Sequence, residues 1–237
     1  MKLVAHVAIG WVLVLGFTVP AMAYEAIEVG NGGSVKGKVI VAGKGPQDET
    51  IKIDKDVEVC GVSQPAHKYE ISDKGEVQSA FVIVEDVQKG KAAPKQDLAI
   101  ENKECHFEPH VGVAYLGAQF VVKNSDPIFH NTKLLLPTGQ TVYNLAFPKQ
   151  GQVIQKPVTK MGFINVQCNA HKWMCAYVYA SEHPYVAVTG KDGSFEIKDL
   201  PPGRYTLKIW HEGLGEQKKT IEVAAGKATE VTVQYAK

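Results

Sequence analysis

Short runs of apolar and β-branched residues, separated at close intervals by glycine or proline, fill the chain from residue 33 to its end. In "GSVKGKVIV" at 33–41, for example, valines alternate with glycine and lysine. Such alternation predicts strands with one buried face. The sequence shows almost no helical period, and a parallel α/β fold would need helices as crossover connections. We therefore expect an all-β chain built from β-sandwiches.

A change of pattern at 182–184 ("EHP") predicts a boundary between two units. After it the expected strands become shorter and more regular, with turn sequences at 191–193 ("KDG") and 201–203 ("PPG"). We expect a first domain over 24–182, with an N-terminal extension, and a second, smaller sandwich over 183–237.

Residues 1–23 have the pattern of a secretory leader. Lys2 supplies a positive start, an apolar run follows, and "AMA" ends at Ala23 as a cleavage site. We therefore expect a periplasmic or secreted protein. No second long apolar stretch follows, so we expect no membrane span in the mature chain.

The net charge of the mature chain argues against two classes of partner. Loss of Lys2 leaves 25 of the 26 basic residues, against 25 acidic ones. A formally neutral protein is not expected to bind nucleic acid or an anionic membrane as its main partner.

Four cysteines fit an oxidising compartment. Cys60 and Cys105 lie far from the other two, and we expect a disulfide between them. Cys168 and Cys175 remain, and they could either form a second disulfide across a short loop or serve a metal.

The stretch "CNAHKWM" places a thiol, an imidazole and a thioether at Cys168, His171 and Met174. These are three of the four ligands of a blue-copper site, which is completed by a second histidine. The candidate is His130 in "NSDPIFHNT", at the start of an apolar strand. Zinc prefers four strong ligands, and calcium and magnesium prefer oxygens, so the expected cofactor is one copper ion.

The segments "DPIFHN" and "CNAHKWM" resemble the two ligand segments of cupredoxins, which are Greek-key β-sandwiches. The C-x2-H-x2-M spacing is similar to the short ligand loop of amicyanins and plastocyanins, and the resemblance covers about 81–180. It implies three equatorial ligands and one axial ligand to a type 1 copper: His130, Cys168 and His171, with Met174 axial. It also implies that Asn131 hydrogen-bonds across to the ligand loop and holds its shape.

Cys175 directly follows Met174 and departs from the family pattern. A strand leaving the loop here would point the two side chains in opposite directions, which favours a buried free thiol. A second copper ligand and a Cys168–Cys175 disulfide are the alternatives. Of the other histidines, His67 and His106 are expected at the surface. Packing or hydrogen-bonding roles are expected for the rest: His110, His183 and His211.

The run "TGKDGSFEIKDLPPGRYTL" resembles the carboxypeptidase regulatory-like, transthyretin-like β-sandwich. This resemblance predicts the fold of the segment but gives almost no information about its function. "GSVKGKVIVAGKGP" also resembles the opening strand of that module, which would make the cupredoxin an insertion, but we expect the tandem order. The whole set of motifs is similar to exported bacterial proteins of a methylamine-utilisation-like group.

These features predict a periplasmic one-electron carrier that works with redox protein partners. It is not expected to be an enzyme, because no base–nucleophile constellation or open ligand position is evident. A copper-delivery protein without a redox role and a structural interaction module with a cupredoxin fold are the alternatives.

Overall fold

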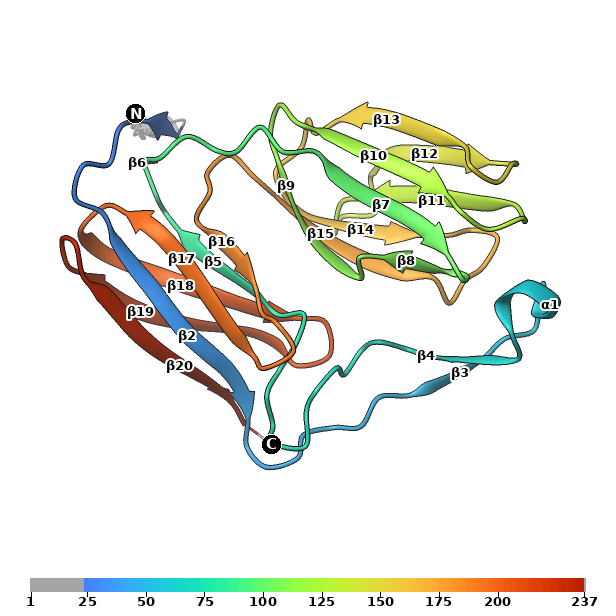
Figure 1. Cartoon of the computed structure of the whole chain (residues 1–237), viewed down its shortest axis with the longest axis horizontal. Coiled ribbons are helices and arrows are strands. Elements are labelled where there is room, and N and C mark those ends of the chain that lie inside the picture. The colour runs from blue at the N-terminus through green and yellow to red at the C-terminus, as the bar shows by residue number, and fades with distance from the viewer. Residues whose placement is uncertain (1–23, 237) are drawn as a thin grey trace, which may run out of the picture.

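The computed structural model describes residues 24–236, so the expected leader at 1–23 lies outside the described residues. Two β-sandwiches stand side by side, and a long excursion of the chain runs from the lower end of one to a position below the other (Figure 1). The all-β fold predicted from the sequence is confirmed. None of the helices formed within 24–236 has the length and apolar character needed to cross a bilayer.

The sandwich that contains both ends of the described chain consists of a four-stranded sheet, β16-β5-β18-β19, and a three-stranded sheet, β17-β2-β20. Its strands are β2 (Gly33–Val41), β5 (Phe81–Glu85), β16 (Val186–Val188), β17 (Ser194–Leu200), β18 (Gly203–His211), β19 (Gly215–Val223) and β20 (Ala228–Tyr235). Alternating residues such as Phe195 and Ile197 point into its core, as the sequence pattern requires. The turn at 191–193 joins β16 and β17, which lie in opposite sheets, so it forms a sandwich corner and not a hairpin.

The tandem order predicted from the sequence, with a boundary between 182 and 183, does not match this topology. β2 lies between β17 and β20, and β5 lies between β16 and β18. β5 and β16 are antiparallel neighbours, with Ile83 opposite Val186. The other sandwich is therefore an insertion between β5 and β16, where a hairpin loop would otherwise join these two strands. This is the alternative to the tandem order that the sequence left open.

The inserted sandwich pairs a four-stranded sheet, β13-β10-β7-β8, with a five-stranded sheet, β12-β11-β14-β15-β9. Its strands are β7 (Leu98–Lys103), β8 (His106–Glu108), β9 (Val111–Tyr115), β10 (Gln119–Asn124), β11 (His130–Leu135), β12 (Thr141–Phe147), β13 (Val153–Pro157), β14 (Gly162–Gln167) and β15 (Cys175–Ser181). Its core contains Phe107, Phe120 and Phe147. We call this unit the copper domain, after the ion its cysteine and histidines predict.

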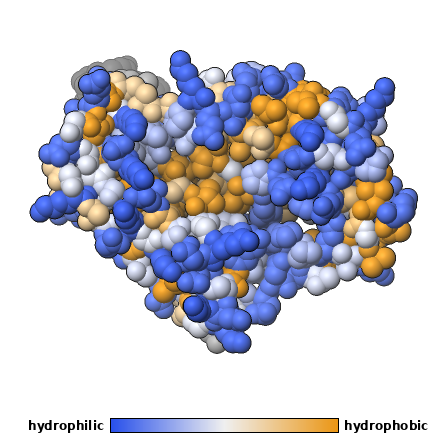
Figure 2. Space-filling model, in the orientation of Figure 1, coloured by the Kyte–Doolittle hydropathy of each residue, from blue (hydrophilic) through white to orange (hydrophobic). Residues whose placement is uncertain are grey.

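Aromatic side chains join the two sandwiches. β5 is buried on both faces, because Val82 and Val84 enter the core of its own sandwich while Phe81 and Ile83 face the copper domain. The ring of Phe163 on β14 packs edge-on against Phe81, with centroids 5.7 Å apart. Apolar surface accordingly gathers at the middle of the molecule, over this junction (Figure 2).

Residues 42–76, which we call the arm, follow β2. They leave the sandwich that contains β2 and β5 and reach the far end of the copper domain (Figure 1). The arm carries β3 (Thr50–Lys52), α1 (Val57–Cys60) and β4 (Ser63–Pro65), and β3 pairs with β4. Ile53 of the arm is 3% exposed and lies in the core of the copper domain. A further short pair, β1 (Glu25–Ala26) with β6 (Lys89–Gly90), joins the N-terminal segment to the chain that enters the copper domain.

Candidate metal centre

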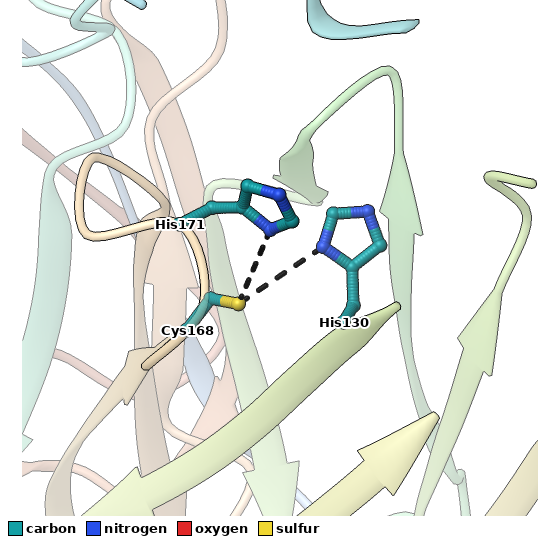
Figure 3. A group of neighbouring side chains, drawn as sticks. All are labelled: His130, Cys168 and His171. Atoms are coloured by element: carbon teal, nitrogen blue, oxygen red, sulfur yellow. Dashed lines mark hydrogen bonds between the residues drawn. The ribbon is translucent and has the colours of Figure 1, made fainter. Parts of the chain in front are cut away.

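Three side chains from two separate segments converge at one end of the copper domain. His130 begins β11, Cys168 follows β14 directly, and His171 lies in the loop that leads to β15. The sulfur of Cys168 is 4.0 Å from His130 Nδ1 and 3.7 Å from His171 Nδ1 (Figure 3). The three donor atoms lie within 4.8 Å of one another, and the residues are at most 3% exposed. The structure therefore brings the distant His130 next to the loop of Cys168 and His171, as the sequence predicts.

Met174 closes the same loop. Its amide donates to the carbonyl of His171 (3.0 Å), and its carbonyl accepts from the amide of Cys168 (3.4 Å). The side chain is 2% exposed and packs in the same core as Cys168. A tight turn over these residues holds the thioether on the buried side of the loop.

Two carboxylates orient the imidazoles. Asp126 lies 2.8 Å from Nε2 of His130, and Asp56 of the arm lies 2.8 Å from Nε2 of His171. Each bond leaves Nδ1 directed at the sulfur, which is how outer carboxylates fix the ring orientation of metal-binding histidines. Asp126 is itself fixed by the amides of Glu104 and Cys105.

Sequence reasoning missed both carboxylates. Asp126 stands four residues before His130, so its place next to a candidate ligand was a usable signal. Asp56 is separated from His171 by 115 positions and lies in a segment without strand or helix periodicity, so no signal in the sequence indicates the contact.

Asn131 links the two ligand segments. Its amide N–H points at the sulfur of Cys168 (3.4 Å), and its side-chain oxygen accepts from the amide of Asn169 (3.2 Å). Its side-chain nitrogen donates to the carbonyl of Leu145 at 3.2 Å and to Asn144. Strand β11, strand β12 and the ligand loop are thus tied through one side chain.

The electrostatics favour a thiolate. Burial alone raises the pKa of Cys168, but the hydrogen bond to His130 and the surrounding backbone donors outweigh it and hold this pKa below its ordinary value. Burial tends to lower the pKa of His130, yet Asp126 and the neighbouring sulfur raise it overall. Burial lowers the pKa of His171 despite the bond to Asp56, so this ring is kept neutral.

The four cysteines form one disulfide and leave two free thiols. The predicted disulfide between Cys60 and Cys105 is confirmed, whereas Cys168 and Cys175 are both free, which excludes a bond between them. Cys175 faces away from the cluster, and burial together with the nearby Glu212 raises its pKa to about 11. A second group, Cys105 with Asp126 and His130, offers no thiolate because Cys105 is in the disulfide.

The donor set fits copper. A thiolate, an imidazole and a thioether from one buried loop, with a second imidazole from the start of β11, are soft and borderline donors that suit Cu(I) and Cu(II). The two nearby carboxylates are engaged with the outer ring nitrogens, so they do not supply the oxygen ligands that calcium or magnesium requires.

His183 and His211 make local hydrogen bonds in the other sandwich. Nδ1 of His183 accepts from the amide of Tyr185, and Nδ1 of His211 accepts from the amides of Gly213 and Leu214. These bonds agree with the structural roles expected for them. His110 is also hydrogen-bonded as expected, to Glu212, and His67 and His106 are partly exposed. What the sequence did not indicate is that these three histidines line one cleft.

The family model of the carboxypeptidase regulatory-like domain matches residues 176–236. The match leaves out β2 and β5, which complete that sandwich. No curated protein sequence matches the chain.

Among solved structures, a purple cupredoxin from Nitrosopumilus maritimus is similar over 36% of this chain and 100% of its own length, at 19% identity and a TM-score of 0.31. A mutant of amicyanin in its reduced Cu(I) form is 15% identical over 42% of this chain and 98% of its own, with a TM-score of 0.32. A Cu-containing nitrite reductase from Thermus scotoductus SA-01 is 19% identical over 39% of this chain and 24% of its own, with a TM-score of 0.31.

The sheet order, the buried cluster and the family match agree with the two resemblances stated from the sequence. Residues 176–236 thus match the model of the carboxypeptidase regulatory-like domain, and the inserted sandwich holds the buried group of His130, Cys168 and His171, with Met174 in the same loop as the cysteine.

Proposed function

We propose that this protein is a one-electron carrier with a single type 1 copper site. The observation that supports it most directly is the convergence of Nδ1 of His130, Nδ1 of His171 and the sulfur of Cys168 in a space closed to solvent. Met174, in the same loop, is the proposed axial ligand. Copper held by this set would alternate between the +1 and +2 states.

The surroundings of the cluster suit electron transfer because they resist movement of the ligands. Asp126 and Asp56 fix the rings, and Asn131 ties the ligand loop to β11 and β12. Ligands that keep one geometry in both oxidation states make electron exchange fast, and the apolar core around the sulfur tunes the potential.

Electron exchange requires a partner that docks near the site. Phe129 precedes His130 and is 47% exposed, so it offers apolar surface next to a proposed ligand. We propose a redox protein as that partner, in the periplasm or outside the cell. The leader pattern supports this location, and neither the near-neutral charge nor the sequence motifs favour nucleic acid.

The test is an absorption spectrum of the copper-loaded full chain with the metal quantified. We expect one copper per chain and an intense visible thiolate-to-copper band, which disappears in Cys168→Ser. Cys175→Ser is the matched control, because its thiol faces the other side of the strand and its loss should leave the band unchanged. A copper-loaded chain without the band would overturn the proposal.

A second measurement separates an electron carrier from a copper-delivery protein. Repeated chemical reduction and oxidation should bleach and restore the band while the copper content stays constant. Release of the copper to an acceptor during each cycle would favour delivery.

A further inference from the structure

A cleft of about 430 Å³ lies where three parts of the chain meet. Its walls come from the arm around His67, from the chain at His106 and His110 in the copper domain, and from Ser79 and Thr189 of the other sandwich. The cleft lies behind the ligand loop, since Trp173 and Met174 of that loop and Cys175 directly after it also line it. His130, Cys168 and His171 are not part of its lining.

Three imidazoles gather in this cleft. The ring of His67 lies 5.8 Å from that of His106 and 6.2 Å from that of His110, measured between centroids. Two imidazoles bound to one tetrahedral ion have centroids about 5 Å apart, because each metal–nitrogen bond is about 2.0–2.1 Å. His67 therefore stands between two rings at nearly the separation that a shared ion requires.

Each of the three rings is held at one nitrogen. Nδ1 of His67 contacts Glu70 at 3.3 Å, and Nδ1 of His106 lies 3.3 Å from the carbonyl of Glu104. Nε2 of His110 contacts the carboxylate of Glu212. The opposite nitrogens make no hydrogen bond to any residue between 24 and 236. A ring bonded at one nitrogen by a carboxylate or carbonyl, with the other nitrogen free, is the arrangement found in metal-binding histidines.

The backbone at His67 is also unusual. Its φ is 59°, a left-handed conformation that few residues other than glycine adopt. Asp48 stabilises it, because its carboxylate accepts from the amides of His67, Lys68 and Tyr69. These three bonds fix the backbone at His67 and therefore the point from which its side chain enters the cleft.

Charge in the cleft favours a cation. Glu70 and Glu108 line it together with a single lysine, Lys191. The side chain of Glu212, bonded to His110, is only 10% exposed. A buried carboxylate requires a positive partner, and a bound divalent ion would supply one to Glu70 and Glu212 through their histidines.

We propose that His67, His106 and His110 form a second metal site, which takes a divalent ion that prefers imidazole, Zn²⁺ or Cu²⁺. The three free nitrogens are further apart than the donors of the first cluster, so binding requires the side chains to move closer together. His67 can make this movement together with Glu70, because its side chain is 36% exposed and that of Glu70 is 27% exposed. The ion would join the arm to the copper domain, and through Glu212 to the other sandwich.

The experiment is a calorimetric Zn²⁺ titration of the full chain carrying Cys168→Ser, so that the result does not depend on the type 1 site. His130 and His171 remain in this parent and can bind zinc themselves, so the proposed site is identified by substitution. We expect His67→Gln, and separately His110→Gln, to remove one equivalent or weaken it at least tenfold. Glu212→Gln, which keeps the ring in place, should weaken the same equivalent by roughly 10–100-fold.

His183→Gln is the matched control, because it removes an imidazole that lies outside the cleft. It should leave the stoichiometry and affinity of the parent unchanged. Circular dichroism of each variant, before zinc is added, identifies any that fail to fold, and the partly exposed His67 makes His67→Gln the variant least sensitive to that problem. Equal zinc binding in the parent and His67→Gln, or no binding in the parent, would overturn the second site.

Discussion

Asp56 Oδ2 lies 2.8 Å from Nε2 of His171, although 115 positions separate the two residues along the chain. The contact exists because the arm runs under the copper domain and is fastened there by the disulfide between Cys60 and Cys105. As a result His171, which is a proposed copper ligand, is completely buried.

Replacing Asp56 by alanine should weaken copper binding. The ring of His171 would lose the bond that orients it and solvent would reach its outer nitrogen, and loss of such an outer partner typically costs about 10–100-fold in metal affinity. The measurement is competition for copper against a chelator of known affinity. Asp54→Ala, which removes an exposed carboxylate from the same segment, is the control and should bind as the parent does.

Replacing Asn131 by alanine should destabilise the metal-free chain by about 1–3 kcal/mol, because it leaves the amide of Asn169 and the carbonyl of Leu145 without their partner. Urea unfolding measures this loss. Asn169→Ala is the matched control, because that side chain is exposed while its backbone amide still donates to Asn131. Equal stability of the two variants would contradict a bridging role for Asn131.

Acid should destabilise the chain through His183. Burial lowers its pKa from 6.5 to about 4 in the folded protein. Between these values the unfolded chain binds a proton that the folded chain does not, so stability is full above pH 6.5 and falls as the pH drops. The loss from this residue reaches about 2–3 kcal/mol at pH 4.5.

The measurement is urea unfolding at pH 7 and at pH 4.5 in a Cys168→Ser parent, where release of copper plays no part. His183→Gln should lose less stability than the parent between the two pH values, because the amide can still accept from Tyr185 without taking up a proton. A parallel pH dependence of His183→Gln and the parent would contradict the prediction.

The fragment 183–237 should not fold by itself. It contains β16 to β20 but lacks β2, which fills the centre of one sheet, and β5, which lies inside the other. Far-UV circular dichroism of the fragment should therefore show an unfolded chain. A chain in which a short Gly-Asn linker replaces 87–183 retains both strands, and it should show β-structure and cooperative thermal unfolding.

The sequence could predict those features whose residues lie close together along the chain. Cys168, His171 and Met174 lie within seven consecutive residues, so their spacing alone indicates the site, and alternation along β17 indicates its buried face. The pairing of β2 with β20 joins Val35 to Thr229, and no local pattern reports which distant strand a strand will choose.

The meeting of two distant histidines has the same explanation. No local pattern relates His67 to His106, and only the path of the arm brings their rings to 5.8 Å. Asp56 was missed in the same way, because the arm has neither a strand period nor a helical one over most of its length.

The bond between Cys60 and Cys105 ties the cover of the ligand loop to the copper domain. It fastens the chain four residues beyond Asp56, where Lys55 also donates to the carbonyl of Ala170 and Ile53 enters the core. A covalent bond so close to Asp56 limits how far this carboxylate can move away from His171. The closure of the metal site therefore depends on the redox state of two cysteines that are not part of it.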